Sequence, residues 1–261
     1  MNRTKKVALV ATLVSGLIVA FAGPVTAADT STVTTTDPNA VIIDAKKVAK
    51  AQGCTLKVKG NCSKKNLSRA DFSGLDLTGM NFSGANLSYA DFSESILTKA
   101  NFSGANLAGA NLSDVTALQA NFTGAALRQA NLDSGDFTKS IFNKAKGSRA
   151  TLTNATFIST SGLGADFSYS DLTGSDFTQA NYKSINFSYA TGLDAIFVDS
   201  QLVGAKFRNA KLTQPDFSGA NLNNADLSNS SITLDDLETS DYCGALLRDG
   251  FYADNDSCQN A

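Results

Sequence analysis

The sequence predicts an all-β solenoid, in which short extended segments stack around a single apolar core. A large apolar residue recurs at nearly every fifth position from Leu67 to Tyr252, and a small residue, often Ala, stands two positions before it. The remaining positions hold mainly Asp, Asn, Ser, Thr and Gly. An α-helix repeats its apolar residues every 3.6 positions and a half-buried strand every two, so a period of five indicates neither.

Each five-residue unit consists of a short extended piece and a turn. In an extended segment, residues two positions apart point to the same side, so the large and the small residue of a unit enter one core together. Asp, Asn, Ser and Gly are residues that form turns. Because a unit of this size cannot bury its apolar pair alone, the units have to stack on one another, as they do in a solenoid.

The unit sequences ADFSG, ANFSG and ANFTG, at residues 70–74, 100–104 and 120–124, resemble the pentapeptide-repeat family, whose pattern is A-(D/N)-(L/F)-(S/T)-X. The resemblance covers residues 65–252. It implies a right-handed quadrilateral parallel β-helix with four units, or twenty residues, in each coil. At a ladder spacing of about 4.8 Å, roughly nine coils form a stack about 45 Å tall.

The arginines support a coil of twenty residues. All five that follow residue 27 belong to units whose central residues are separated by multiples of twenty, so such a coil places them on one side of the solenoid. They are Arg69, Arg128, Arg149, Arg208 and Arg248, and units of the same side contain Tyr89, Tyr169 and Tyr189. Arg and Tyr are enriched at binding hot spots, so we predict that these eight residues form a binding surface. The alternative is an ordinary solvated face.

The sequence also predicts the character of two other sides and the way in which interruptions of the core are filled. The next side is acidic at its outward positions, which are Glu94, Asp114, Asp133 and Asp194. Another side is predicted to be flat, because it repeats glycine at Gly84, Gly104, Gly124, Gly164 and Gly204. Four frame positions lack a large side chain, and we expect the leucine that follows three of them to fill the core. The four are Ala117, Gly147, Gly162 and Gly192, and the leucines are Leu118, Leu163 and Leu193.

Residues 37–64 are predicted to form an N-terminal cap that contains a helix. Asp37 reads as its N-cap, Pro38 as its first helical residue and Gly53 as its end. Its apolar stripe consists of Val41, Ala45 and Val48. We expect this helix to pack over the first coil, because a solenoid otherwise exposes its core and an unpaired edge.

The N-terminus reads as an export signal. Residues 1–27 begin with basic residues, continue with an apolar stretch and end with small residues at Val25 and Ala27, which predicts cleavage after Ala27. The alternative, an uncleaved membrane anchor, is disfavoured because the stretch is short for a span. Residues 28–36 then form a flexible linker. The mature chain keeps 19 basic against 24 acidic groups and no membrane-spanning segment, and it is expected in the periplasm, outside the cell or, in a cyanobacterium, in the thylakoid lumen.

Four cysteines in an exported chain predict two disulfides. Three pairings are possible from sequence, but a stack about 45 Å tall separates the two ends far beyond the roughly 7 Å that a disulfide allows between Cα atoms. We therefore predict Cys54–Cys62 and Cys243–Cys258, the latter closing a C-terminal cap at residues 241–261. The acidic spacing of the DGFYADND segment fits no standard calcium loop, so no metal and no cofactor are expected.

Catalysis is not expected. The chain has no His, which excludes Ser-His-Asp and Cys-His mechanisms, and the paired carboxylates of Asp171 and Asp176 fall on the ordinary D/N position of the repeat. We predict an exported structural or interaction scaffold, a monomer or weak dimer that binds an unidentified envelope or extracellular protein. The alternative is a DNA mimic that inhibits or protects a topoisomerase-type enzyme, as the resemblance implies for some cytoplasmic members. The arginine side and the export signal argue against it, and no nucleic acid is expected as a partner.

Overall fold

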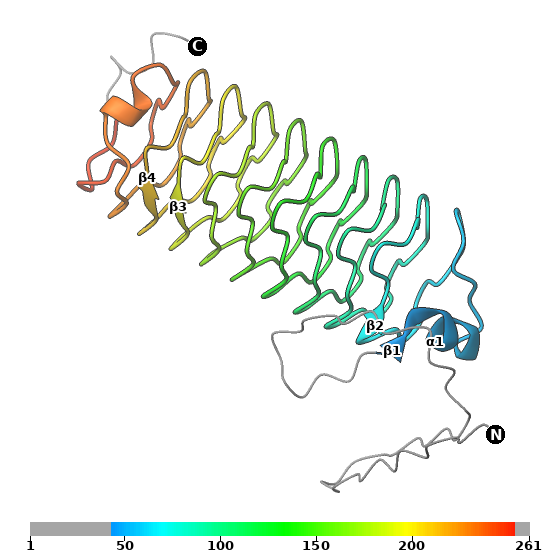
Figure 1. The fold of residues 1–261 in the computed structure, drawn as a ribbon. Helices are drawn as coiled ribbons and strands as arrows, with labels where there is room; N and C mark the ends of the chain where they lie inside the picture. Colours follow the sequence, from blue (N-terminus) through cyan, green and yellow to red (C-terminus); the bar gives the residue numbers. More distant parts are fainter. Residues whose placement is uncertain (1–42, 254–261) are drawn as a thin grey trace, which may run out of the picture. The chain divides into compact units, whose positions relative to one another are not determined.

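The structure, a computed structural model, describes residues 43–253 of the chain. Parallel bridges join residues that are twenty positions apart throughout the stack, from Asn61↔Asn81 to Asp226↔Leu246. This constant offset confirms four five-residue units in each coil. Figure 1 shows these coils stacked in the order of the chain.

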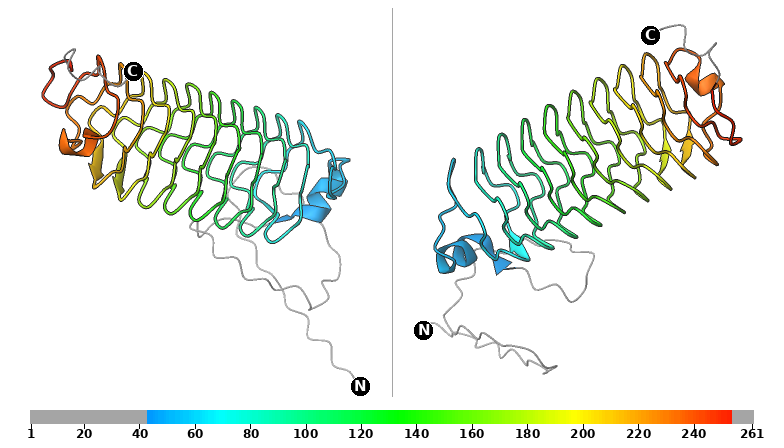
Figure 2. Two further views of the ribbon diagram at one scale, coloured as in Figure 1. Left: turned by 90° about the horizontal axis from the view of Figure 1, so that it is seen from above. Right: turned by 180° about the vertical axis from the view of Figure 1, so that it is seen from behind.

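Regular elements are few and short, because most units contribute a single bridge residue between two turns. Strand β1 (Ile43–Asp44) pairs in parallel with β2 (Ala70–Asp71), and β3 (Thr191–Leu193) pairs in parallel with β4 (Lys211–Thr213). Helix α1 (Ala45–Ala51) lies at the start of the stack, and the 3-10 helix η1 (Asp235–Leu237) lies near its other end (Figure 2).

The turn of most units uses a left-handed residue. The Ala70 N–H donates to the Leu67 carbonyl at 3.2 Å, and Arg69 between them has a φ of 60°. A positive φ at the third residue of a turn is the feature of a type II turn. The residues at this position in successive coils lie above one another, because the coils are in register. We call each such row of residues a turn column.

Asp and Asn side chains stabilise the outside of the coils. The Ser73 N–H donates to Oδ1 of Asp71 at 3.0 Å, which satisfies a backbone donor in the turn. Between coils, Nδ2 of Asn86 donates to Oδ1 of Asn66 at 3.0 Å, and Nδ2 of Asn106 donates to Oδ1 of Asn86 at 3.1 Å. The D/N position of the repeat therefore serves both the turn and the contact between coils.

The five-residue frame forms the core, as predicted. Phenylalanines twenty residues apart stack along the axis, and the ring centroids in the column from Phe82 to Phe142 lie 4.7 to 5.2 Å apart. A second column runs from Phe137 to Phe217 with centroids 4.9 to 5.2 Å apart. Neighbouring columns meet edge to face, as Phe92 and Phe102 do at 5.6 Å, so the core is packed with rings in favourable geometry.

The expectation that a following leucine fills the core interruptions was wrong. Leu163 and Leu193 are 38% and 44% exposed, and Leu118 is only partly buried. At two of the interruptions an aromatic ring from the next coil occupies the space instead: a Cβ added at Gly147 would overlap Phe167, and one added at Gly162 would overlap Tyr182. Leu163 lies in a turn and Leu193 is the last residue of β3, and the register of the bridges keeps both side chains outside, whereas a ring twenty residues away can lean across the gap.

The N-terminal helix begins later than predicted. Strand β1 occupies residues 43–44, so α1 begins at Ala45, and Oδ1 of Asp44 accepts a hydrogen bond from the Lys46 N–H at 2.8 Å. Gly53 ends the helix as predicted, with a φ of 68° and the Cys54 N–H donating to the Ala49 carbonyl at 2.9 Å. The expected start at Asp37, Pro38 and Val41 lies outside the described residues.

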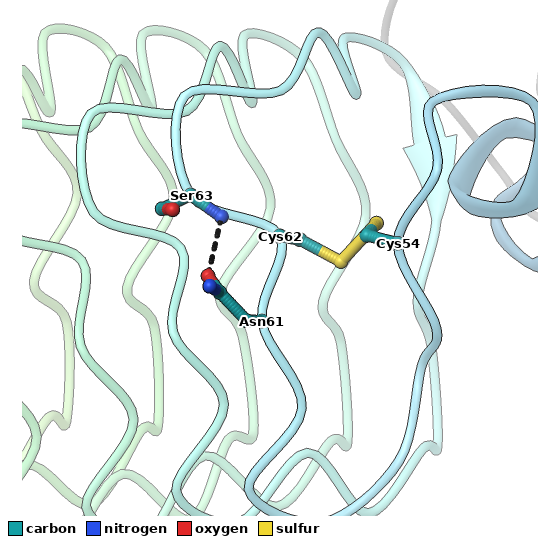
Figure 3. The surroundings of a disulfide bond; sticks show 4 residues. All are labelled: Cys54, Asn61, Cys62 and Ser63. Atoms are coloured by element: carbon teal, nitrogen blue, oxygen red, sulfur yellow. Dashed lines mark hydrogen bonds between the residues drawn. A yellow bond between two sulfur atoms is a disulfide. The ribbon is translucent and has the colours of Figure 1, made fainter.

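The predicted disulfide between Cys54 and Cys62 is confirmed (Figure 3). Their Cα atoms lie 5.1 Å apart, and both side chains are buried where the first coil begins. Cys243 is also disulfide-bonded, but Cys258 lies outside the described residues, so the pairing Cys243–Cys258 stays a prediction. Near the end of the stack, Leu246 pairs antiparallel with Tyr252, and the Tyr252 side chain is exposed although the frame places it in the core.

Candidate functional site

The predicted binding residues lie on one side of the coils, because the register of the bridges is constant. We call it the Arg/Tyr side. Its units are those with central residues Leu67, Leu87, Leu107, Leu127, Gly147, Phe167, Phe187, Phe207, Leu227 and Leu247. Two residues after each centre lies the turn column, and one residue after each centre lies a second outward row.

The first cluster on this side is a stack of Arg149, Tyr169 and Tyr189. The Arg149 guanidinium carbon lies 5.7 Å from the centre of the Tyr169 ring, within the range of a cation–π contact. The rings of Tyr169 and Tyr189 are 4.7 Å apart with planes 2° apart. Both rings remain about half exposed, at 53% and 46%, so the stack is ordered by its own contacts and still faces solvent.

A second cluster lies near the start of the same turn column. The Arg69 guanidinium carbon lies 5.2 Å from the centre of the Tyr89 ring. The ring lies over Gly109 in the next coil, because a Cβ added at Gly109 would lie 2.6 Å from it. Gly109 therefore provides the space for the ring. The column continues with Gln129, which separates this cluster from Arg149.

The large residues of the column occupy a backbone conformation that favours glycine. Arg69, Tyr89, Arg149, Tyr169 and Tyr189 have φ values between 58° and 62°. A residue with a Cβ in the left-handed region costs roughly 1 kcal/mol, and such residues cluster at functional sites. Lys, Gln, Asn and Ser hold the same position elsewhere, so the conformation by itself does not distinguish a binding surface.

The other three arginines lie in the second outward row and do not join the stacks. Arg128 and Arg208 are four coils apart, about 19 Å at the ladder spacing of a parallel sheet. Arg248 lies two coils beyond Arg208. None of the five arginines forms an ion pair with another residue of the described part of the chain. The predicted site thus consists of one Arg–Tyr–Tyr stack, one Arg–Tyr pair and three separate arginines.

Lys144 and Lys146 were missing from the predicted site. Together with Arg128 they line an open hollow of about 640 Å³ at the edge of the Arg/Tyr side. The sequence contained a signal for Lys146. It follows Arg128 by 18 residues, and because a coil has twenty, the two residues lie in neighbouring coils at nearly the same place around the solenoid. The prediction for this side rested on arginines and tyrosines and included no lysine.

The structure also describes the glycine side and the acidic side. A Cβ added at Gly104, Gly124 or Gly164 would meet nothing within 4 Å, so this side is open at the glycines. On the acidic side, Glu94, Asp114 and Asp194 lie in one turn column. Gly, Ser, Asn and Gln hold other positions of that column, so its carboxylates are not continuous.

The model of a known family matches this chain. Eight copies of "Pentapeptide repeats" match residues 66–104, 105–143, 148–181 and 200–233, which is more than half of the sequence. The chain belongs to the pentapeptide-repeat family. Pentapeptide-repeat proteins fold as right-handed quadrilateral β-helices and are generally structural or interaction proteins without enzymatic activity.

Solved structures of pentapeptide-repeat proteins are similar to this chain. HetL, involved in regulation of heterocyst differentiation in the cyanobacterium Nostoc sp. strain PCC 7120, is 26% identical over 74% of this chain and 83% of its own, with a TM-score of 0.38. QnrB1, a plasmid-mediated fluoroquinolone resistance protein, is 18% identical over 79% of this chain and 88% of its own, with a TM-score of 0.43. A pentapeptide-repeat protein from the Arabidopsis thaliana thylakoid lumen is 34% identical over 44% of this chain and 69% of its own, with a TM-score of 0.17. No curated protein matches the sequence.

Two further findings apply to residues 43–253 only. No helix there is both long and apolar enough to cross a membrane. No three of the His, Cys, Asp and Glu residues in this range are grouped so that they could hold a metal ion.

Proposed function

We propose that this pentapeptide-repeat protein is an exported, non-catalytic scaffold that binds a protein partner through its Arg/Tyr side. The observation that carries the proposal is the stack of Arg149, Tyr169 and Tyr189, which holds two half-exposed rings parallel at 4.7 Å. Exposed aromatic and arginine side chains are the residues most enriched at the centres of protein interfaces.

The rigidity of the surface supports this function. Each stacked ring sits on a turn that is fixed by backbone hydrogen bonds to the next coil, such as Tyr169 N–H to the Ser188 carbonyl at 3.0 Å. Binding to such a surface orders few additional side chains, so it avoids part of the roughly 0.5–1.5 kcal/mol that each immobilised side chain costs.

Export is proposed from the basic and apolar residues 1–27 and from the Cys54–Cys62 disulfide, since disulfides persist in oxidising compartments. The alternative, a DNA mimic acting on a topoisomerase-type enzyme, requires a continuous acidic face. The acidic turn column is interrupted at Ser134 and Asn154, and a row of arginines lies on the adjacent side, so we favour the exported scaffold.

The test is capture of a partner from the envelope and secreted fractions of the source organism with the chain from residue 28 onward. The loss variant carries Arg149→Ala, Tyr169→Ala and Tyr189→Ala. Its matched control carries Lys139→Ala, Gln179→Ala and Asp199→Ala, which are left-handed turn residues ten positions away in the chain and therefore on the opposite side.

Capture by the wild type and the control, with loss in the first variant, supports the proposed surface. Equal capture by all three proteins, or loss in both variants, contradicts it.

A further inference from the structure

The hollow at the edge of the Arg/Tyr side arises where outward side chains become small. In the preceding coils, Asn66, Asn86 and Asn106 form a ladder of hydrogen bonds at the D/N position. The ladder stops at Ala126, which has no side-chain polar group, and resumes where Asn186 Nδ2 donates to Asp166 Oδ1 at 2.9 Å. The space without the ladder belongs to the hollow of about 640 Å³.

Three cations and one carboxylate line this hollow. The cations are Arg128, Lys144 and Lys146, all exposed, and none forms an ion pair within residues 43–253. The carboxylate is Asp166, whose Oδ1 already accepts hydrogen bonds from the Ser168 N–H at 3.0 Å and from Asn186. The lining thus carries an excess of positive charge, although the whole chain is net negative.

We propose that this hollow binds an oxyanion group, phosphate or sulfate. Arg128 can donate two parallel hydrogen bonds to such a group, and the ammonium groups of Lys144 and Lys146 supply further donors and charge. The Ser148 hydroxyl also lines the hollow and supplies a further donor. A site of this kind is independent of the protein partner proposed above.

The size of the hollow allows two sources of the bound oxyanion, a free anion or a phosphate group on a larger molecule. A volume of about 640 Å³ lies within the range of small-molecule sites, which is roughly 300–1,000 Å³, so it accommodates more than a bare ion. Free phosphate and the phosphate of a phosphorylated sugar share the same chemistry. The experiment therefore uses inorganic phosphate and glucose 6-phosphate, with glucose as the uncharged control.

The test is a titration of the ¹⁵N-labelled chain from residue 28 onward, followed by amide NMR shifts at constant ionic strength. We expect saturable shifts for amides at residues 126–128, 144–148 and 164–166. Arg128→Gln with Lys144→Gln and Lys146→Gln should weaken binding at least tenfold. The control, Lys99→Gln with Lys139→Gln and Lys211→Gln, removes the same charge at exposed positions outside the hollow and should bind as the wild type does.

A second variant tests the cavity with all charges retained. Ala126→Ile fills the hollow, and the fold accepts isoleucine at this repeat position, as Ile96 and Ile141 show. It should weaken binding of glucose 6-phosphate more than that of inorganic phosphate. Tighter binding of glucose 6-phosphate identifies an organic phosphate as the ligand, and tighter binding of inorganic phosphate identifies the free anion. No saturable shift with either probe, or equal weakening in the control variant, overturns the proposal.

Discussion

The ring of Tyr169 lies flat on the ring of Tyr189, with centroids 4.7 Å apart and planes 2° apart, although both rings face solvent. The two residues are one coil apart and share the left-handed turn conformation, with φ values of 60° and 61°. Identical backbone geometry at both positions makes the side chains leave the coils in parallel. The contact between the rings therefore results from the repeated turn geometry and not from burial in the core.

Replacing these tyrosines should reveal a coupling between them. Tyr169→Ala and Tyr189→Ala should each lower the free energy of unfolding, and the double variant should lose less than the sum, by about 0.5–1.5 kcal/mol. Urea unfolding of the wild type, both single variants and the double variant completes the cycle. Additive losses would contradict an attractive contact between the rings.

Gly162→Ala should destabilise the core. The added Cβ would overlap the buried ring of Tyr182, and an overpacked core typically loses about 1–3 kcal/mol. In a Tyr182→Leu background, the same substitution should cost less, because the ring is no longer there. Thermal or urea unfolding of the four proteins measures the difference, and an unchanged cost in the Tyr182→Leu background would refute the proposed filling of the gap.

Loss of the Cys54–Cys62 disulfide should loosen the start of the stack. The bridge spans 8 residues, and the loop-entropy model gives about 2–3 kcal/mol for a loop of this size. Because coils contact only their neighbours, the effect should be local. In Cys54→Ala with Cys62→Ala, hydrogen exchange should accelerate at residues 54–72 and stay unchanged near Phe142. Uniform acceleration along the stack would show that the coils unfold as one unit.

The stability of the protein should fall at alkaline pH partly because of Tyr182. Burial raises the pKa of this phenol above its ordinary value, while its hydrogen bond with the Thr160 hydroxyl, at 2.9 Å, opposes that change. The unfolded chain releases this proton from about pH 10, whereas the folded chain retains it, so stability is fully present below pH 10 and is lost as the pH rises further.

Tyr182→Phe isolates this contribution. The variant should lose about 1 kcal/mol at neutral pH with the hydrogen bond. Above pH 10 its unfolding free energy should fall less steeply than that of the wild type, by up to about 1.4 kcal/mol per pH unit. Urea unfolding between about pH 8 and pH 11 measures both slopes, and parallel slopes would show that the phenol ionises in the folded state too.

The elements that the sequence predicted are those that repeat. The frame from Leu67 defined the core, the spacing of the arginines indicated twenty residues per coil, and the stack height led to the Cys54–Cys62 pairing. Prediction failed where the repeat is broken. The helix begins at Ala45 because the two preceding residues form β1, which pairs with β2. This pairing joins segments 27 residues apart, and the local sequence around residues 43–44 does not predict it.

The sequence by itself determined which residues share a side, because a constant period converts position in the chain into position around the coil. Only the tertiary structure decided which of them touch. Arg149, Tyr169 and Tyr189 stack because their turns are in register, while Arg128 remains apart and meets Lys144 and Lys146 across a hollow. The physical reason is that side-chain length and the space left by small residues in neighbouring coils govern contact, and neither is contained in the period.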